Sequence, residues 1–270
     1  MRDAGQPTFT GVRRLPAQDY IYRLPLMPWI CPPLHPELAR AVENIGVHAV
    51  LLPGERLFQT GEPVRHIALV RRGMVARKLG DYGSVSDNHI ALAPPGNLAS
   101  GNLNLFSHRP AVGSYSALMT SEIVWCDQRA FLAVVEKDPD LFKLLLLQCE
   151  LSVLSDRLSF ACKLLQKADV SLRIFLLVWA FNYGHIEGDR VVAQRVLTRD
   201  QVKNVLGCSI GWLDRILKEW RAQGVRSEAA GTVSYPLAFF EEADRYLAAM
   251  EEKSGAVMRA RNIRDYWMSA

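Results

Sequence analysis

The stretch from residue 198 to residue 224 reads TRDQVKNVLGCSIGWLDRILKEWRAQG, and its pattern predicts two short helices joined by a turn. Apolar residues recur at helical spacing in each half of the stretch. Thr198 and Ser209 are residues of the kind that cap a helix N-terminus, and each stands just before one half. Gly207 lies between the halves and Gly224 follows the second half, at positions where a helix commonly ends in a positive-φ residue.

This layout is that of a helix-turn-helix, in which the N-terminal part of the second helix contacts base edges in the major groove of DNA. An ordinary helical hairpin inside a larger core is the alternative. Residues 195–226 carry seven basic and three acidic residues, and this net charge of +4 equals that of the whole chain. Such a local excess favours DNA binding, because it is expected where a protein neutralises phosphates. The candidate DNA-contacting residues are Thr198, Arg199, Ser209, Ile210, Gly211, Trp212, Arg215 and Lys218.

The composition of the chain is that of a globular protein large enough for two domains, with 270 residues, 49% of them hydrophobic and 22% charged. The first residues contain no apolar segment, so a secretory signal is not expected. The longest apolar run, residues 174–181, is far too short to span a membrane, so no membrane contact is expected. The odd number and wide scatter of the cysteines indicate reduced thiols in a cytoplasm. They are Cys31, Cys126, Cys149, Cys162 and Cys208.

Between residues 47 and 131, short β-rich runs alternate with glycine and proline turns. The runs are residues 47–52, 67–71, 74–79, 90–93, 114–118 and 123–126. Regularly spaced short strands of this kind predict an antiparallel sandwich or barrel. The proline-rich residues before them predict an irregular arm, followed by a short helix over residues 36–45.

A long helix is predicted to open at Asp138-Pro139, since proline is tolerated in the first turn of a helix. Its apolar residues include a heptad seam formed by Leu144, Leu147, Leu151, Leu154, Leu158, Ala161 and Leu165. Further leucines broaden the seam, which favours a helix that serves both its own sheet domain and a second copy of the chain. A parallel pair of such helices would place two helix-turn-helix units side by side, as dyad-related half-sites on DNA require.

The remaining segments complete an α+β fold. Residues 170–183 predict a buried helix, and residues 225–227 and 232–235 predict a hairpin, or wing, around Gly231. The predicted domains are an N-terminal arm with a short helix (1–46), a β-barrel sensor domain of jelly-roll type (47–137), a dimerisation helix (138–168), a winged helix-turn-helix domain (169–236) and a C-terminal helical extension (237–270).

With this order of elements, residues 47–235 resemble the Crp/Fnr family of bacterial transcription regulators. PGERLFQTGEPVRHIALVRRGMV is similar to the opening barrel strands of the family, and ADVSLRIFLLVWAF is similar to the helix that opens its DNA-binding domain. The most specific match is LTRDQVKNVLGCSIGWLDRIL, which is similar to the helix-turn-helix of the family. No cofactor is expected. The resemblance implies a cyclic-nucleotide-binding-like barrel and a homodimeric regulator that binds operator DNA. It leaves open whether RNA polymerase is a partner and whether a small-molecule effector exists.

Residues 101–123 stand where the family carries its phosphate-binding cassette, but two positions depart from it. Members that bind cyclic nucleotides have a Gly-Glu pair that holds the ribose and an Arg that pairs with the phosphate. Here the first position reads Gly101-Asn102, and the second falls near Ala111-Val112. A buried phosphate without an opposing charge is costly, so control by cyclic AMP is not expected unless Arg109 takes over that role. The candidate effector-pocket residues are Gly101, Asn102, Leu103, Asn104, Arg109, Ser114 and Ser116.

The second helix of the motif also departs from the family, whose members often present an Arg and a Glu just after the serine cap. Ile210 and Gly211 occupy these positions. Ile210 can contact a thymine methyl group but cannot make the bidentate guanine contact of an arginine. Arg215 matches the remaining base-reading position, with a phosphate contact as the alternative. Trp212 either lies at the edge of the core or wedges against the DNA backbone.

Two other classes of function remain as alternatives. One is a sensory or protein-interaction module of the same fold that has lost specific DNA reading. The other is an enzyme, which the sequence does not favour because it holds no nucleophile–base constellation or phosphate loop. No metal site is expected, since the cysteines are not clustered and no two histidines have metal-ligand spacing on one helix. Cys208 is a candidate redox thiol because helix N-termini lower a thiol pKa, with simple packing as the alternative.

Overall fold

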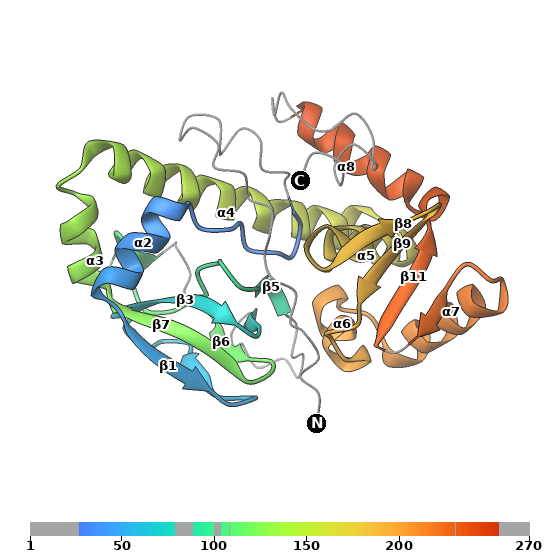
Figure 1. Cartoon of the computed structure of the whole chain (residues 1–270), viewed down its shortest axis with the longest axis horizontal. Helices are drawn as coiled ribbons and strands as arrows, with labels where there is room; N and C mark the ends of the chain where they lie inside the picture. The colour runs from blue at the N-terminus through green and yellow to red at the C-terminus, as the bar shows by residue number, and fades with distance from the viewer. Residues whose placement is uncertain (1–26, 79–88, 100–103, 108, 230, 254–270) are drawn as a thin grey trace. The chain divides into compact units, whose positions relative to one another are not determined.

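The computed structural model describes residues 27–78, 89–99, 104–107, 109–229 and 231–253. These residues divide into two compact units. The first unit holds the described residues up to 167 together with residues 199–209, and the second holds residues 168–198 and the described residues from 210 on. Figure 1 labels most of the elements of the two units, and each unit is described separately below.

The first unit is built on two antiparallel sheets. One sheet has the order β1-β7-β3, with β1 at Val47–Leu51, β7 at Ser121–Asp127 and β3 at His66–Arg72. The other has the order β2-β6-β4-β5, with β2 at Arg56–Phe58, β6 at Ser114–Ala117, β4 at Val75–Lys78 and β5 at His89–Ala93. All six predicted strands are present. The three-residue β2 was not predicted, because it is too short to show an alternating pattern.

One hydrophobic core joins the two sheets. Phe58 and Tyr115 from one sheet are buried in the same cluster as Ala68, Val70 and Ile123 from the other. Strands alternate their side chains between two faces, so Ala68 and Val70 of β3 both point into this cluster. The predicted antiparallel sheet domain and the α+β class are therefore confirmed.

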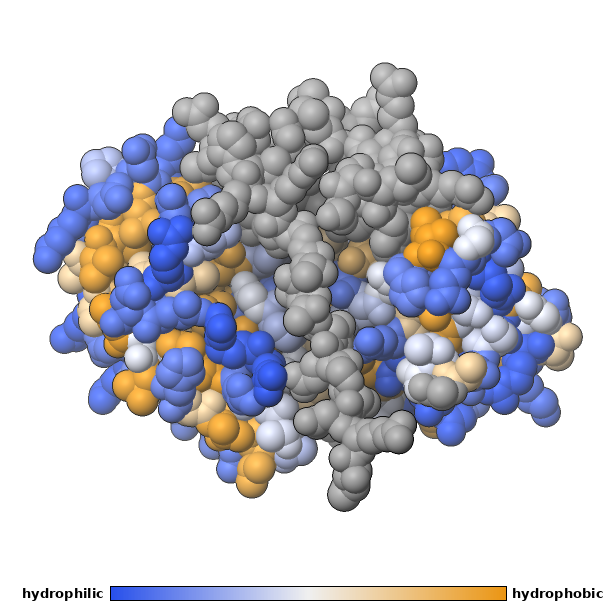
Figure 2. All heavy atoms as spheres, in the orientation of Figure 1, coloured by the Kyte–Doolittle hydropathy of each residue, from blue (hydrophilic) through white to orange (hydrophobic). Residues whose placement is uncertain are grey.

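Apolar side chains are also exposed on the edge strand β1 and just after it. Val47, Val50 and Leu52 are each more than half exposed. Figure 2 shows apolar residues gathered at the lower left, on the side where Figure 1 labels β1. Among the described residues this strand pairs only with β7, so its outer edge bounds the sheet.

Two short helices accompany the sheets. α2 spans Pro36–Ile45, as predicted, and buries Leu38 and Val42. α3 spans Gln128–Val135 and was not predicted. The Asp127 carboxylate accepts a hydrogen bond from the backbone N–H of Ala130 at 2.9 Å and so caps α3.

The long helix α4 spans Pro139–Leu165 and confirms the helix predicted to open at Asp138-Pro139. The Asp138 carboxylate accepts hydrogen bonds from the backbone N–H groups of Asp140 and Leu141 at 3.0 and 3.2 Å. An aspartate at this position satisfies N–H groups that have no partner within the helix.

The first helix of the predicted helix-turn-helix, α6 at Arg199–Leu206, belongs to the unit of the sheets. The side-chain amide of Gln201 donates a hydrogen bond to the backbone carbonyl of Leu118 at 3.2 Å. Gly207 follows α6 with a φ of 70°, which a residue with a side chain adopts only at a cost. Both predicted helices and the glycine turn after the first are present.

The second unit contains α5 (Ala168–Tyr183), α7 (Ile210–Ala222) and a four-stranded antiparallel sheet of order β10-β11-β9-β8. β10 (Ser227–Ala229) pairs with β11 (Thr232–Pro236), which confirms the predicted wing hairpin. The first strand begins two residues later than predicted.

Another hairpin in this sheet was not predicted. β8 (Gly184–Glu187) pairs with β9 (Arg190–Gln194) across Gly188 and Asp189, and Gly188 has a φ of 61°. A Gly-Asp pair between two strand-like runs is a two-residue hairpin signal that the sequence does contain.

An aromatic cluster holds the inner face of α7. The Trp220 ring packs edge-on against Phe239 at 4.8 Å and Tyr235 at 6.4 Å between ring centroids. The guanidinium group of Arg173 on α5 lies 4.9 Å from the Phe239 ring centroid and 5.8 Å from that of Trp220. Phe239 lies in a short 3-10 helix, η2 (Leu237–Phe240), which leads into α8 (Glu241–Lys253).

Two general properties bear on function. Within the described ranges, no helix has a stretch long and apolar enough to cross a membrane. All five cysteines are free thiols.

Candidate nucleic-acid interface

The outward face of α7 carries exposed cations. Leu213 and Trp220 are buried in the unit, so residues on the opposite side of the helix face outward. Gly211, Arg215 and Lys218 lie on that side, because residues at i, i+4 and i+7 share one face of a helix. Arg215 and Lys218 are exposed, and within the described residues neither forms an ion pair.

The other predicted contact residues stand near the helix starts. Ile210, the first residue of α7, is 39% exposed, whereas Trp212 is half-buried. Thr198, Arg199 and Ser209 are exposed. Ser209 directly precedes α7, in the position of a capping residue.

Glycine at position 211 is not explained by packing. Apart from the chain neighbours of Gly211 and the backbone of its own helix, no described atom lies within 4 Å of the place that a Cβ would occupy there, and the backbone φ of Gly211 is not positive. Glycine nevertheless weakens a helix relative to alanine. A glycine on an open, cationic face is consistent with close approach of a partner's backbone.

Three arginines converge on one acidic residue of the wing. Glu228 on β10 forms ion pairs with Arg221 at 2.7 Å, with Arg195 at 3.7 Å and with Arg226. Although burial opposes the shift, the guanidinium groups of Arg226 and Arg221 hold the pKa of Glu228 below its usual value. The side chains of Arg195 and Arg221 remain 58% and 60% exposed, so both also face solvent.

Arg226 has a structural role. It is buried, and its Nε donates a hydrogen bond to the Tyr235 hydroxyl at 3.2 Å. Burial raises the pKa of Tyr235 to about 12, so this hydroxyl keeps its proton at neutral pH. The charge count over residues 195–226 thus included one buried arginine and left out Glu228, which lies just beyond that range.

The predicted effector pocket is only partly described. Gly101, Asn102 and Leu103 lie outside the described residues. The side-chain amide of Asn104 donates to the carbonyls of Arg109 at 3.0 Å and Pro110 at 2.8 Å, and so closes its own loop.

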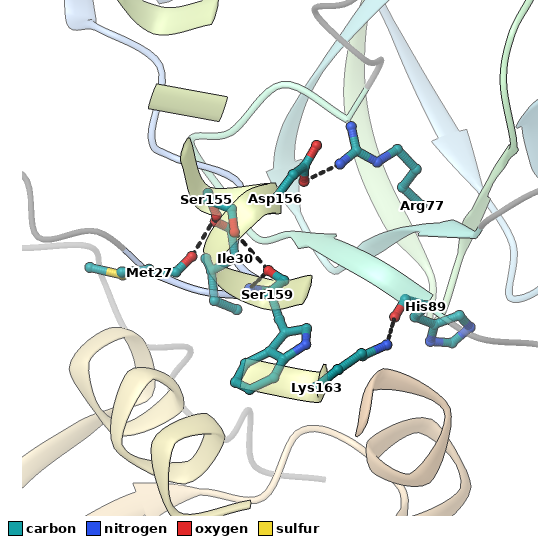
Figure 3. A network of polar contacts seen from close by, with 9 residues as sticks. Met27, Ile30, Arg77, His89, Ser155, Asp156, Ser159 and Lys163 are labelled. Carbon is teal, nitrogen blue, oxygen red and sulfur yellow. Dashed lines mark hydrogen bonds and ion pairs between the residues drawn. The ribbon is translucent and has the colours of Figure 1, made fainter. Parts of the chain in front are cut away.

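The remaining pocket candidates differ in exposure. Arg109 is exposed, Ser114 is half-buried and Ser116 is buried on β6. A buried charge that the sequence analysis missed lies on the neighbouring strand β4. Arg77 is buried there and forms an ion pair with Asp156 of α4 (Figure 3).

The Arg77–Asp156 pair ties a strand to the long helix. Burial raises the pKa of Asp156, and the adjacent guanidinium opposes that shift. A buried arginine beside a carboxylate is not open to an anionic ligand unless the pair separates. The available signal in the sequence was an arginine that directly follows the apolar run Met74-Val75-Ala76.

The predicted heptad seam divides between two surfaces. Leu144, Leu151 and Leu158 are buried in their own unit. Leu147, Leu154 and Ala161 are half-buried, and Leu165 is 75% exposed. Among their neighbours, Leu146 and Phe160 are exposed and Leu164 is 80% exposed.

The expectation of a lowered thiol pKa at Cys208 is corrected by the structure. Burial raises the pKa of this thiol and outweighs the lowering effects of its backbone hydrogen bond and of Lys203 and Lys163. The packing alternative is therefore favoured. The part of the chain that the structure describes holds no group of three or more histidine, cysteine or acidic residues that could bind a metal ion.

Comparison with known proteins gives no match to a protein-family model and none to a curated protein sequence. Solved structures do match in fold. FixK2 from Bradyrhizobium japonicum is 15% identical, with a TM-score of 0.61 over 71% of this chain and 92% of that one. A CooA variant from Carboxydothermus hydrogenoformans is 16% identical, with a TM-score of 0.59 over 78% of this chain and 89% of that one.

A third structure is described as a transcriptional regulator of the CRP/FNR family from Thermus thermophilus. It is 16% identical, with a TM-score of 0.56 over 75% of this chain and 98% of that one. Each of these likenesses covers most of both chains. The chain therefore has the fold of the Crp/Fnr family of transcription regulators.

Proposed function

We propose that the protein is a sequence-specific DNA-binding transcription regulator that acts as a homodimer in the cytoplasm. The observation that supports this most directly is the outward face of α7, where Arg215 and Lys218 are exposed and make no ion pair among the described residues. Unpaired cations on the second helix of such a motif suit a groove lined with phosphates. Matches to regulators of the same fold agree with this assignment.

Within this face, the side chains have different roles. Arg215 reads a base edge, since arginine makes bidentate contacts with guanine. Ile210 offers an apolar surface to a thymine methyl group, and Gly211 lets the helix approach the DNA closely. Lys218, further along α7, neutralises a phosphate. The target sequence thus differs from one read by the Arg-Glu pair common in the family.

The dimer uses the outer side of α4. The predicted seam is retained only where its residues remain accessible, at Leu147, Leu154, Ala161 and Leu165. The exposed Leu146, Phe160 and Leu164 widen this surface. Leu144, Leu151 and Leu158 instead hold α4 in its own unit.

The regulator does not respond to cyclic AMP. Arg109, the one cation of the cassette that could replace the missing phosphate partner, is exposed. Arg77 is buried but already paired with Asp156. Neither position offers a free, buried positive charge to a cyclic phosphate.

The proposal is tested by selecting preferred sites from random DNA and measuring their affinity by fluorescence anisotropy at physiological salt. Arg215→Ala should reduce discrimination at one base position by about 1–3 kcal/mol, whereas Lys218→Ala should weaken all sequences alike. Arg245→Ala is the matched control, because Arg245 is an arginine of α8 in the same unit. A parent protein with only non-specific affinity would contradict the proposal.

A second candidate function is a sensory or interaction module that has kept the fold but lost specific reading. The observation that favours it is the pair Ile210-Gly211, which offers no hydrogen-bonding side chain at the start of α7. It predicts no enriched sequence in the selection and stable capture of a protein partner in its place.

A further inference from the structure

Residues 27–34, named the strap here, lie along the edge of one sheet. Ile30 forms a parallel bridge with Leu92 of the edge strand β5. The N–H of Leu92 donates to the carbonyl of Trp29 at 2.7 Å, and the N–H of Cys31 donates to the carbonyl of Leu92 at 2.8 Å. Leu34 continues the contact by donating to the carbonyl of Gly96 at 2.9 Å. The strap therefore adds to the sheet edge as an extended peptide does in β-augmentation.

The opposite side of the strap is bound by α4. Ser155 Oγ lies 2.5 and 2.8 Å from the carbonyl oxygens of Met27 and Ile30, which share its single hydroxyl proton as acceptors. Ser159 Oγ accepts a hydrogen bond from the N–H of Trp29 at 2.6 Å (Figure 3). The side-chain amide of Gln148 donates to the carbonyl of Pro32 at 3.1 Å.

These three α4 residues form one binding face. Gln148, Ser155 and Ser159 are separated by seven and four residues, so they line one side of the helix. All three are buried in a helix that is otherwise rich in leucine. Buried polar groups are costly unless hydrogen-bonded, and all three have backbone partners in the strap.

The strap also fills space with apolar side chains. Trp29 and Ile30 are fully buried, and Leu34 is nearly so. Trp29 has a φ of 63°, in the left-handed region that a bulky residue rarely adopts. Such a conformation persists when its surroundings over-determine it, and here hydrogen bonds hold the strap from both sides.

We propose that the space between β5 and α4 is a peptide-binding site that the chain fills with its own strap. The strap then occupies this site as a permanently bound ligand. The strap, and not a small molecule, holds α4 against the sheets in the position that dimerisation requires. The inference rests on the proposed function, because it assigns α4 to the dimer. The Arg77–Asp156 pair joins the same sheet to the same helix beside Ser155 (Figure 3).

This site is selective for an extended segment with a buried aromatic ring. Its hydrogen bonds go to backbone groups, so they do not depend on the side chains of the bound segment. The space that the Trp29 indole occupies makes the site select a segment with an aromatic side chain at this position. Truncating this one side chain should leave a cavity that free indole can enter, since apolar cavities in protein interiors bind small aromatic molecules.

The test uses the full chain with Trp29→Ala. Without indole, this variant should dimerise and bind its selected DNA site about tenfold more weakly than the parent. Millimolar indole should restore both properties and raise the unfolding temperature of the variant only. The matched control is Phe58→Ala, a truncation in the core between the sheets, for which indole should restore neither property.

A second variant covers the case that Trp29→Ala does not fold. Ser155→Ala keeps the strap sequence but leaves the carbonyls of Met27 and Ile30 without this donor, and it should weaken dimerisation and DNA binding together. A variant of either kind that is destabilised yet dimerises and binds DNA like the parent would overturn the proposal.

Failure of the proposed function is distinguishable from failure of this inference. If the parent shows no preferred DNA sequence, the regulator assignment falls, and the strap is then judged by self-association alone. Sedimentation equilibrium of Trp29→Ala, with and without indole, supports the inference if indole strengthens the dimer and overturns it if the dimer is unaffected.

Discussion

The carboxylate of Glu228 on β10 lies 2.7 Å from the guanidinium of Arg221 in the last turn of α7. This contact joins the proposed recognition helix to the wing of the same unit. Glu228 also forms ion pairs with Arg195 and Arg226, so one negative charge faces three positive ones. If this surface binds DNA as proposed, Glu228 lowers the positive charge that the phosphates meet.

Replacing this acid should strengthen DNA binding. Glu228→Gln keeps the size of the side chain but leaves Arg195 and Arg221 free to contact phosphates. We expect a several-fold higher affinity for all DNA sequences, with a salt dependence steeper by about 0.9 for each additional phosphate that is neutralised. Anisotropy titrations over a range of salt concentrations measure both quantities.

The control for this variant is Glu219→Gln, which removes the same charge from an exposed position of α7. If both variants change the affinity equally, the effect comes from net charge and not from release of Arg195 and Arg221.

Gly211→Ala should separate stability from function. Since a Cβ at this position meets nothing beyond the chain neighbours and the backbone of its own helix, the substitution should stabilise α7 by about 0.5–1 kcal/mol. If the DNA backbone approaches α7 here, affinity should fall even as the unfolding temperature rises. Gly224→Ala makes the contrasting case, because a φ of 69° predicts a loss of stability. Equal DNA affinity for the Gly211→Ala variant and the parent would exclude close approach at this residue.

The two sides of α4 should respond differently to substitution. Leu165→Glu places a charge on the exposed side and should weaken self-association in sedimentation equilibrium while leaving the unfolding of the monomer nearly unchanged. Leu151→Ala removes a buried side chain and should cost about 2–5 kcal/mol of stability. If self-association is unchanged by Leu165→Glu and by other charged substitutions on this side of α4, the dimer interface lies elsewhere.

Lys163 should make the stability of the folded chain depend on pH. Its Nζ donates to the carbonyl of His89 at 3.3 Å, and burial lowers its pKa from 10.5 to about 8. Below pH 8 this lysine is charged in both the folded and the unfolded chain, so the folded state bears the full cost of burying the charge. Between pH 8 and 10.5 the unfolded chain binds more protons than the folded chain, so this contribution to stability improves as the pH rises.

Lys163→Met removes the buried charge and should be more stable than the parent at pH 7, by up to about 3 kcal/mol. Its advantage should shrink as the pH approaches 10.5, because the folded parent then carries a neutral lysine. Denaturant unfolding of both proteins at several pH values measures the difference, in which other titrating groups cancel. If the stability difference between Lys163→Met and the parent does not change with pH, the lowered pKa of Lys163 is contradicted.

Much of the fold was predictable because its signals are local. Alternating runs between glycine and proline turns located six of the seven strands of the first unit, and Asp138-Pro139 located the start of α4 to the residue. β2 was missed because three residues carry too little periodicity. The β8–β9 hairpin was missed although its Gly188-Asp189 turn was visible in the sequence.

The candidate interface was predictable in outline only. Helical spacing places Gly211, Arg215 and Lys218 on one side of α7, and the buried Leu213 and Trp220 confirm that this side faces outward. The ion pairs of Arg195, Arg221 and Arg226 were not predictable, because they depend on how the tertiary structure places Glu228 of β10 beside them.

The sequence by itself determined most of the elements and their order, since helix and strand periods, capping residues and positive-φ glycines act over a few residues. Only the tertiary structure decided which side of α4 is buried, because its leucines satisfy more than one helical face. It alone paired Arg77 with Asp156 and Trp29 with Ser159, partners separated by 79 and 130 residues. Contacts at such separations depend on how the sheets and helices pack together, and no local pattern in the chain encodes that packing.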